Sequence, residues 1–172
     1  MNLYQSLGYL VLGSRMRRLS EAFLSEINQA YQKRGIDFDA GWFPVFYLLS
    51  KNNHLSIKEL SEQTDVSHPA ASQLITNLKS RDLVTSTTCT DDGRRQLVQL
   101  TDKGRVLLAQ LLPVWDAILQ AMQEMVDDEP GCKALLPAMS AIESAFKEKS
   151  LAEKICTKLP TQLKPAPNGQ HI

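Results

Sequence analysis

Two neighbouring arginines, Arg94 and Arg95, lie in a short charged segment directly after Asp92 and Gly93. An aspartate can hold an arginine extended through a bidentate ion pair, which leaves other guanidinium N–H groups for a phosphate or a minor-groove base edge. In an isolated segment such residues usually form a solvated hairpin tip, whose exposed ion pairs add little stability. Here the segment follows two predicted short helices, and this position favours the phosphate-binding interpretation.

A second group of polar residues shares one face of the helix that we predict over residues 68–81. With 3.6 residues per turn, the opposite face carries apolar residues that should pack in a core, namely Ala71, Leu74, Ile75 and Leu78. Short hydroxyl and amide groups permit close approach to base edges, whereas ordinary protein surfaces favour Lys and Glu. We therefore expect this outer face to contact bases; its residues are Pro69, Ser72, Gln73, Thr76 and Ser80.

The expected contacts divide into two kinds. Base contacts are expected from Ser72, Gln73 and Thr76, because a glutamine amide suits adenine and hydroxyls suit several bases. His68 and Pro69 lie beside them in the first turn of the helix. Phosphate contacts are expected from the surrounding polar and charged residues, which are Lys58, Ser67, Lys79 and Arg81.

The first of the two short helices is predicted from its end signals. Ser56 and Glu59 form a Ser-x-x-Glu capping box, and Leu55 and Leu60 occupy the two positions of a hydrophobic staple. This helix therefore begins at Ser56, and a turn over residues 64–66 follows it.

The second short helix should begin after Ser67, whose hydroxyl can cap it, because Pro69 fits a first turn in which its missing N–H costs nothing. Two strands are then predicted over residues 83–88 and 96–100, paired across the loop 89–95 that carries the arginines. The order of helix, turn, helix and β-hairpin is that of a winged helix-turn-helix domain, in a mainly α chain with a small β-hairpin wing.

Longer helices are predicted on both sides of this domain. One spans residues 3–34, where Gly8 and Gly13 weaken the first turns by about 1 kcal/mol each, and it ends at Gly35. A shorter helix over residues 39–53 leads into the capping box. Because the first helix is longer than a small domain needs, part of its apolar stripe is expected to face another subunit. A fully intramolecular helix explains the stripe nearly as well.

Two more helices follow the hairpin. Thr101 caps a helix that extends past Trp115 and is kinked at Pro113, and a last helix covers residues 132–149, with an extension to residue 156 left open. From residue 157 onward, prolines among polar residues predict a disordered tail.

The composition excludes several classes of function. Nineteen Lys and Arg balance nineteen Asp and Glu, so a DNA-binding surface must come from the local placement of charge. Apolar runs such as those at residues 9–12 and 45–49 are far shorter than the roughly 20 residues that span a bilayer, which predicts a cytoplasmic protein without a membrane partner. Cys89, Cys132 and Cys156 show no Cys-x-x-Cys spacing, and no catalytic motif occurs. We expect no enzyme, no metal and no cofactor.

These elements together resemble the MarR (multiple antibiotic resistance regulator) family of bacterial winged-helix transcription regulators. The resemblance covers nearly all of the chain before residue 157 and is most specific over residues 55–84 and 91–104. The second segment closes with Leu100, Thr101 and Gly104, in the Leu-Thr-x-x-Gly pattern that starts the family's next helix.

The wing is where the family pattern assigns single residues. Its usual Asp-x-Arg sequence falls on Asp92, Gly93 and Arg94, so the resemblance implies that Arg94 is the wing arginine and Asp92 its brace. Many members have a basic residue at the position of Gly93. This chain has Arg95 just after instead, which leaves open which guanidinium enters the groove.

The resemblance also implies an assembly. It is a homodimer in which the helices of residues 1–34 and 102–156 intertwine, and each subunit offers one winged domain, residues 35–101, to a palindromic DNA site; residues 157–172 form the tail. Half-sites about one helical turn apart follow from this geometry.

Regulation by a small aromatic or anionic ligand is implied as well, and with it the role of a repressor. The ligand of similar proteins binds between the dimerisation helices and the winged domain. An aromatic cluster at helical spacing is more often plain core. The residues that could line such a cleft here are Arg15, Arg18, Trp42, Phe43, Phe46 and Tyr47.

Two other functions compete with this interpretation. A winged helix can dock a protein partner without touching DNA, and the neutral net charge fits that role; only a DNA-binding protein should lose affinity steeply as salt rises. Similar winged domains can also precede an acetyltransferase, but the residues after Phe146 are expected to be too few for one. The operator and the effector are not encoded in any recognisable motif.

Overall fold

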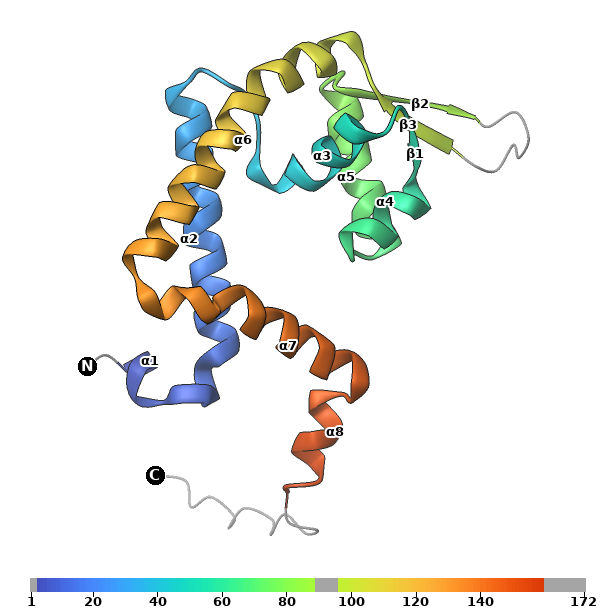
Figure 1. Ribbon diagram of the computed structural model, residues 1–172. Helices are drawn as coiled ribbons and strands as arrows, with labels where there is room; N and C mark the ends of the chain where they lie inside the picture. The colour runs from blue at the N-terminus through green and yellow to red at the C-terminus, as the bar shows by residue number, and fades with distance from the viewer. Residues whose placement is uncertain (1–2, 89–95, 160–172) are drawn as a thin grey trace, which may run out of the picture. The chain divides into compact units, whose positions relative to one another are not determined.

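The computed structural model describes residues 3–88 and 96–159. By their internal contacts the residues form two compact units, 1–120 and 121–172. Figure 1 shows the order of the elements along the chain.

The predicted helix over residues 3–34 is divided into three pieces. They are α1 (Leu3–Ser6), the 3-10 helix η1 (Gly8–Val11) and α2 (Leu12–Lys33). The single long helix was wrong at its beginning, because Gly8 adopts a φ of 53°, in the left-handed region that favours glycine and ends a helix. At the other end Gly35 has a φ of 67°, and the Ile36 N–H bonds to the Tyr31 carbonyl at 3.0 Å, which is the Schellman pattern of a helix end. The predicted end at Gly35 is confirmed.

The winged domain follows in the predicted order. Asp39 caps η2 (Ala40–Trp42), and α3 carries Pro44 in its first turn. The strands form one antiparallel sheet in the order β1-β3-β2, with Leu55 opposite Val98 and Val84 opposite Leu100. Strand β1 was not predicted, because two residues are too short to show an alternating pattern. The elements are α3 (Phe43–Lys51), β1 (Leu55–Ser56), α4 (Ile57–Thr64), α5 (His68–Ser80), β2 (Val84–Thr88) and β3 (Gln96–Leu100).

Helix α6 (Asp102–Asp128) runs through Pro113 without interruption, although a proline removes one intrahelical hydrogen bond. Whether Pro113 kinks it stays a prediction. Among the described residues, α6 is the one helix whose length and apolar composition would suffice to cross a bilayer, a property that helices packed against protein share.

The last predicted helix begins with a 3-10 turn, η3 (Pro130–Ala134), and is interrupted near Ser150. It consists of α7 (Leu135–Glu148) and α8 (Leu151–Cys156). Residues 160–172, where most of the disordered tail was predicted, lie outside the described residues.

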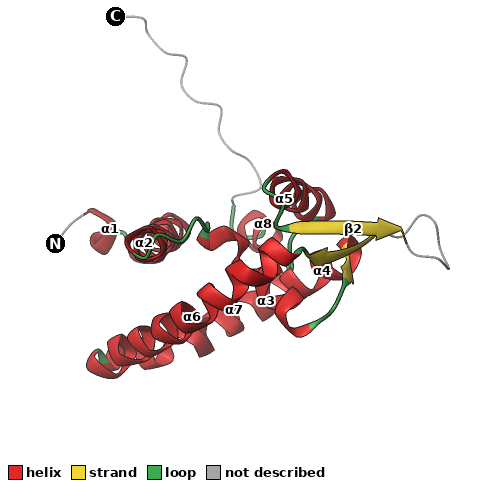
Figure 2. Cartoon of the chain, turned by 90° about the horizontal axis from the view of Figure 1, so that it is seen from above, coloured by secondary structure: helices red, strands yellow, loops and turns green. Residues whose placement is uncertain are grey.

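The main core lies in the first unit and fixes the position of α5. Phe46, Leu60, Leu78, Val98 and Leu111 are completely buried there, so α3, α4, α5, β3 and α6 all contribute to one apolar cluster. Figure 2 shows α5 beside β2, at the end of the sheet opposite β1 in strand order. The helix with the polar outer face is therefore held by a packed core.

Candidate nucleic-acid interface

Helix α5 turns its apolar face inward and its polar face outward. Ala71, Ile75 and Leu78 are at most 2% exposed, whereas Gln73 and Thr76 are exposed. This confirms the inward face for those three residues, and Leu74 is only partly buried. The outer face is thus presented to solvent by a helix that cannot rotate without disrupting the core.

The N-terminus of α5 is built as the sequence predicts. The Ser67 hydroxyl accepts a hydrogen bond from the Ala70 N–H at 3.4 Å, and Pro69 lies in the first turn. The left-handed Asp65, with a φ of 54°, ends α4 just before. Ser67, His68 and Pro69 are all exposed at this end of the helix. Their backbone and side chains are therefore accessible to a ligand at the tip of the domain.

Side chains on the outer face bond mainly to their own helix. The Gln73 Nε2 group donates to Asn77 Oδ1 at 3.2 Å, and the Thr76 hydroxyl donates to the Ser72 carbonyl at 2.9 Å. A glutamine amide can make up to four hydrogen bonds, so Gln73 keeps capacity for a base. Exposed Asn77 was missed by the sequence analysis, although its position four residues after Gln73 could have indicated it.

The cations around α5 differ in their surroundings. Lys58 on α4 has a side chain that is 79% exposed and pairs with Glu62 at 3.8 Å, a contact worth little at such exposure. The Lys79 ammonium instead donates to the Ser86 hydroxyl at 2.5 Å and so joins α5 to β2. Arg81, the residue that caps α5, pairs with Asp37 at 3.1 Å. Lys58 is the predicted phosphate-binding cation that faces solvent most freely among these three.

The predicted wing is confirmed at its base. Strands β2 and β3 pair along their whole length, from Val84 opposite Leu100 to Thr88 opposite Gln96. The residues that join them include Cys89, Asp92, Arg94 and Arg95, and these four lie outside the described residues. Their predicted roles stay predictions.

The hairpin is tied to α6 by the Leu-Thr-x-x-Gly segment. The Thr101 hydroxyl donates to the Asp82 carbonyl at 2.7 Å and accepts from the Gly104 N–H at 3.0 Å. Gly104 packs so closely on the Leu83 carbonyl that a Cβ at this position would overlap it. This close contact is the physical reason for a glycine at the fifth position of that pattern.

Of the four aromatic residues predicted to line a ligand cleft, Phe46 lies in the core, Trp42 is partly buried, and Phe43 and Tyr47 are exposed. Phe46 is completely buried and stacks edge-on against Phe38 at 5.0 Å between ring centroids. Phe43 contacts Trp115 of α6 in the same manner at 4.9 Å. Buried Tyr31 accepts a hydrogen bond from the Trp115 indole N–H at 3.1 Å. Burial raises the pKa of the Tyr31 phenol, and the bond from Trp115 acts in the opposite direction.

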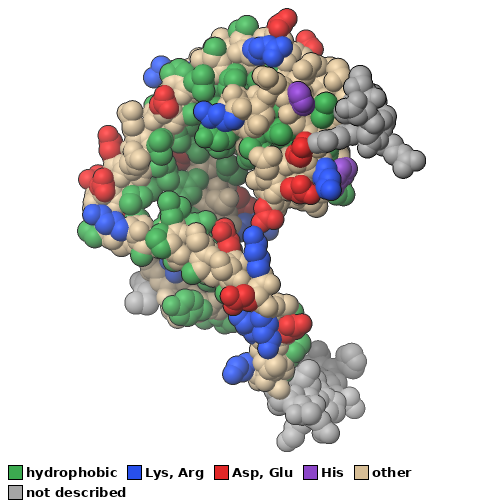
Figure 3. Space-filling view, turned by 45° about the vertical axis from the view of Figure 1, so that its right-hand side comes forward, with side chains coloured by type: hydrophobic (Ala, Val, Ile, Leu, Met, Phe, Trp, Pro, Cys, Tyr) green, Lys and Arg blue, Asp and Glu red, His purple; other side chains and the backbone are tan. Residues whose placement is uncertain are grey.

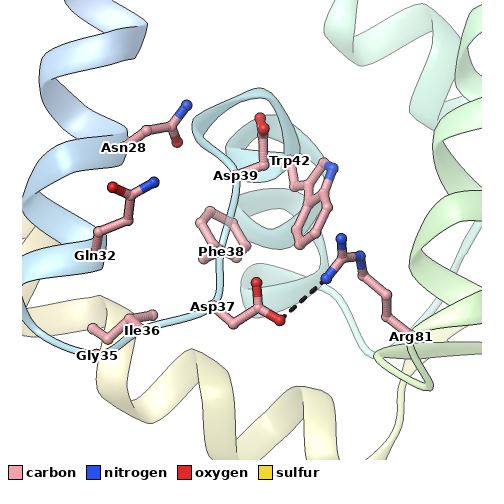
Figure 4. Close-up of a pocket in the computed structure, with 9 residues that line it drawn as sticks. All are labelled: Asn28, Gln32, Gly35, Ile36, Asp37, Phe38, Asp39, Trp42 and Arg81. Carbon is pink, nitrogen blue, oxygen red and sulfur yellow. Dashed lines mark hydrogen bonds and ion pairs between the residues drawn. The ribbon is translucent and has the colours of Figure 1, made fainter.

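A cavity of about 470 Å³ lies where the end of α2 meets the next loop and the end of α5. Figure 4 shows Trp42 and Arg81 on one side of it and the amides of Asn28 and Gln32 on the other. The Asn28 amide is engaged, because its Oδ1 accepts the Ala40 N–H at 2.7 Å. The remaining lining residues are Gly35, Ile36, Asp37, Phe38 and Asp39.

The two arginines predicted to bind a ligand, Arg15 and Arg18, do not line this cavity. Arg18 lies over the ring of Tyr4 at 4.7 Å, ten residues before Asn28, which corresponds to about 15 Å along an α-helix. Arg15 lies one turn earlier still and is partly buried. The structure therefore brings Trp42 together with Arg81, and not with the arginines that the sequence analysis selected.

Comparisons with known proteins find the same kind of winged domain in transcription regulators. Residues 36–95 match the model of the MarR family. The chain is 26% identical over 128 residues to the HTH-type transcriptional regulator FarR of Neisseria gonorrhoeae, covering 73% of this chain and 86% of FarR.

Two solved structures show the same fold. One is the C80S mutant of MarR from E. coli in complex with operator DNA, with a TM-score of 0.66, 19% identity, and coverage of 83% of this chain and 99% of that one. The other is the PcaV transcriptional regulator from Streptomyces coelicolor in complex with its natural ligand, with a TM-score of 0.63, 19% identity, and coverage of 78% and 92%. The winged domain of this chain is therefore similar to that of the MarR family of winged-helix transcription regulators, and the solved structures share its fold.

Proposed function

We propose that the protein is a homodimeric, sequence-specific DNA-binding regulator in which α5 of each subunit enters the major groove. The observation that carries this proposal is the exposed outer face of α5, made of short hydroxyl and amide side chains on a helix whose other face is buried. An α-helix fits the major groove, where each base pair presents its own pattern of donors and acceptors. Base contacts are assigned to Ser72, Gln73 and Thr76.

Phosphate contacts surround these base contacts in the proposed complex. Ser67 and Lys58 are exposed on the side from which α5 would enter the groove, and Lys79 lies at its other end. Arg94, braced by Asp92, and Arg95 would anchor the wing to the flanking backbone or minor groove. Such contacts fix the register of the protein on DNA, while the groove contacts supply specificity.

The proposal of a dimer rests on large apolar side chains that are exposed to solvent in the single chain. In the first unit, Leu19 of α2 is 53% exposed and Leu119 of α6 is 57% exposed. In the second unit, Leu136 and Phe146 of α7 are 73% and 56% exposed. Apolar side chains cover broad areas of the face shown in Figure 3. Exposed apolar side chains of this size in each unit are typical of a subunit interface, and a second copy would present two α5 helices to a palindromic site.

A small aromatic or anionic ligand is proposed as the regulator of this repressor. The cavity of about 470 Å³ that Trp42 and Arg81 line could hold such a ligand, but an anion there would have to displace Asp37 from Arg81. The structure of PcaV with its natural ligand makes such regulation a reasonable hypothesis for this chain. Quenching of tryptophan fluorescence by a series of aromatic acids, read against loss of DNA binding, tests it.

The DNA-binding proposal is tested by selecting duplexes from a randomised library with the purified protein and measuring affinity at several salt concentrations. We expect an enriched palindrome, and affinity that falls linearly in a plot of its logarithm against the logarithm of salt. Sedimentation of the free protein should give a dimer at micromolar concentration. No enrichment, or an affinity for a protein partner that salt leaves unchanged, would support the protein-docking alternative.

A further inference from the structure

We propose that Arg81 is a positioning residue, which holds the end of α5 at the angle that base contacts require and does not itself bind a phosphate. The inference rests on the proposed DNA-binding function. Arg81 follows the last residue of α5, and its guanidinium Nη1 lies 3.1 Å from the Asp37 carboxylate. Its Cζ atom also lies 4.8 Å from the centre of the Trp42 ring. We call these three residues the Arg81 clamp.

The clamp joins α5 to the segment that follows α2. Asp37 lies in the loop after α2, and Trp42 lies in η2, so both partners belong to the chain between α2 and α3. Planar guanidinium groups favour this combination of a carboxylate at the edge and an aromatic ring at the face. Figure 4 shows the three side chains pointing toward one another.

The same end of α5 is held from α6 through the backbone. The Lys103 ammonium donates to the Arg81 carbonyl at 2.7 Å, and the Thr101 hydroxyl donates to the Asp82 carbonyl at 2.7 Å. Asp82 has a φ of 59°, so the chain makes a defined left-handed turn here. Residues 81 and 82, at the end of α5, are therefore bonded both to the segment after α2 and to the segment around the start of α6.

Packing alone does not fix the Arg81 side chain. Asp37 and Arg81 line the 470 Å³ cavity and also a second one of about 240 Å³, which further includes Leu83, Lys103 and Val106. With open space on two sides, the carboxylate and the indole ring are the contacts that determine where the guanidinium lies. Loss of either contact would leave the side chain free to move.

Because the clamp lies at one end of α5, a small change there would displace the base-contacting residues along the helix. Helix α5 has 13 residues and is therefore about 20 Å long. A tilt of about 5° at the clamped end displaces the other end by about 1.7 Å, which is enough to break hydrogen bonds to base edges. A change in the clamp should thus reduce specific binding more than general attraction to the phosphate backbone.

The neighbouring carboxylate also argues against a phosphate contact. The Asp37 carboxylate already accepts a hydrogen bond from Arg81 Nη1 at 3.1 Å and offsets the guanidinium charge at close range. If Arg81 bound a phosphate, removal of Asp37 would strengthen DNA binding. If Arg81 positions α5, the same change weakens specific binding even though it deletes a negative charge. The two roles therefore predict opposite signs.

The experiment compares Asp37→Asn, Arg81→Gln, the double variant and Arg81→Lys on two probes, a duplex enriched by the wild-type protein and a mixed-sequence duplex. Glu21→Gln is the matched control, because it removes a carboxylate from another exposed arginine pair, that of Arg17 at 2.8 Å. The melting temperature of each variant verifies that it is folded.

We expect Asp37→Asn to bind the enriched duplex about 2- to 5-fold more weakly, with unchanged affinity for mixed-sequence DNA and an unchanged salt slope. The double variant should bind the enriched duplex no more weakly than Arg81→Gln, because both substitutions remove the same interaction. Arg81→Lys should fail to restore specific binding, since lysine lacks the planar group that stacks on Trp42. Glu21→Gln should resemble the wild type.

Equal or tighter binding of both duplexes by Asp37→Asn would overturn the clamp. So would a salt slope lowered by about 0.9 in Arg81→Gln together with rescue by Arg81→Lys, because that pattern belongs to a phosphate contact. Failure of the wild-type protein to enrich any duplex would instead refute the proposed function, and the clamp with it.

Discussion

Gly104→Ala is the substitution whose sign the structure predicts most sharply. Gly104 is the third residue of α6, where alanine would normally stabilise a helix by up to about 1 kcal/mol relative to glycine. Here the added Cβ would overlap the Leu83 carbonyl oxygen and lie 3.3 Å from the Leu100 Cδ2 atom. Backbone cannot move aside as easily as the end of a flexible side chain, so the hairpin and α6 must separate.

The magnitude follows from the contacts that this separation disturbs. Overpacking of a close contact costs about 1–3 kcal/mol. The Leu83 carbonyl also accepts the Thr101 N–H at 3.1 Å, and a weakened hydrogen bond costs about 1 kcal/mol more. After the gain in helix propensity is subtracted, Gly104→Ala should lower the free energy of unfolding by about 1–3 kcal/mol.

Urea denaturation at a fixed protein concentration measures this change, since the stability of the proposed dimer would depend on concentration. Gly13→Ala is the matched control: Gly13 also lies in a helix, α2, but a Cβ there meets nothing within 4 Å. The control should be neutral or slightly more stable than the wild type. If Gly104→Ala were as stable as Gly13→Ala, the close approach of α6 to the hairpin would be refuted.

Three further predictions concern the core and the outer face of α5. Tyr31→Phe leaves the Trp115 indole N–H without its acceptor and should cost about 1–2 kcal/mol in urea denaturation. Because the pKa of Tyr31 is raised in the folded state, the unfolded chain loses its proton first, so stability should fall as pH rises above about 10, and this part of the fall should be absent from Tyr31→Phe. Gln73→Ala should weaken binding to the enriched duplex by about 1–3 kcal/mol and relax the base preference at one position, which affinities for single-base variants of the site would reveal. Lys58→Gln should weaken binding to all duplexes alike and lower the salt slope by about 0.9; an unchanged slope would remove Lys58 from the phosphate contacts.

The winged domain was predictable because its signals are local. The capping box is formed in full: the Ser56 N–H donates to the Glu59 carboxylate at 2.8 Å, and the Glu59 N–H donates to the Ser56 hydroxyl at 3.2 Å. Both bonds join residues three apart, so the sequence pattern contains the whole interaction. The inward face of α5 was predictable for a similar reason, since helical periodicity alone separates Ile75 and Leu78 from Gln73.

What the sequence could not indicate depends on residues far apart in the chain. The phosphate contact predicted for Arg81 stays a prediction, but its ion pair with Asp37 could not be foreseen, because Asp37 lies 44 residues earlier. Strand β1 was missed for the same reason, because its two residues form a strand only by pairing with β3. The sequence predicted that Gly8 would weaken the first helix. It could not show that Gly8 adopts the left-handed conformation that interrupts this helix.

The zero net charge of the chain constrains how it can bind DNA. Nineteen basic and nineteen acidic residues provide no general attraction to phosphates, so affinity must come from the few cations placed around α5 and in the wing. Of these, Lys79 is bonded to Ser86 and Arg81 is paired with Asp37, and Lys58 is the most exposed of the three. With few phosphate contacts, affinity should still fall with salt, but less steeply than for a strongly basic protein, and binding to random sequence should be weak. Correct placement of the base-contacting face should then decide affinity, which is why a clamp at the end of α5 would matter more in this chain than in a strongly basic relative.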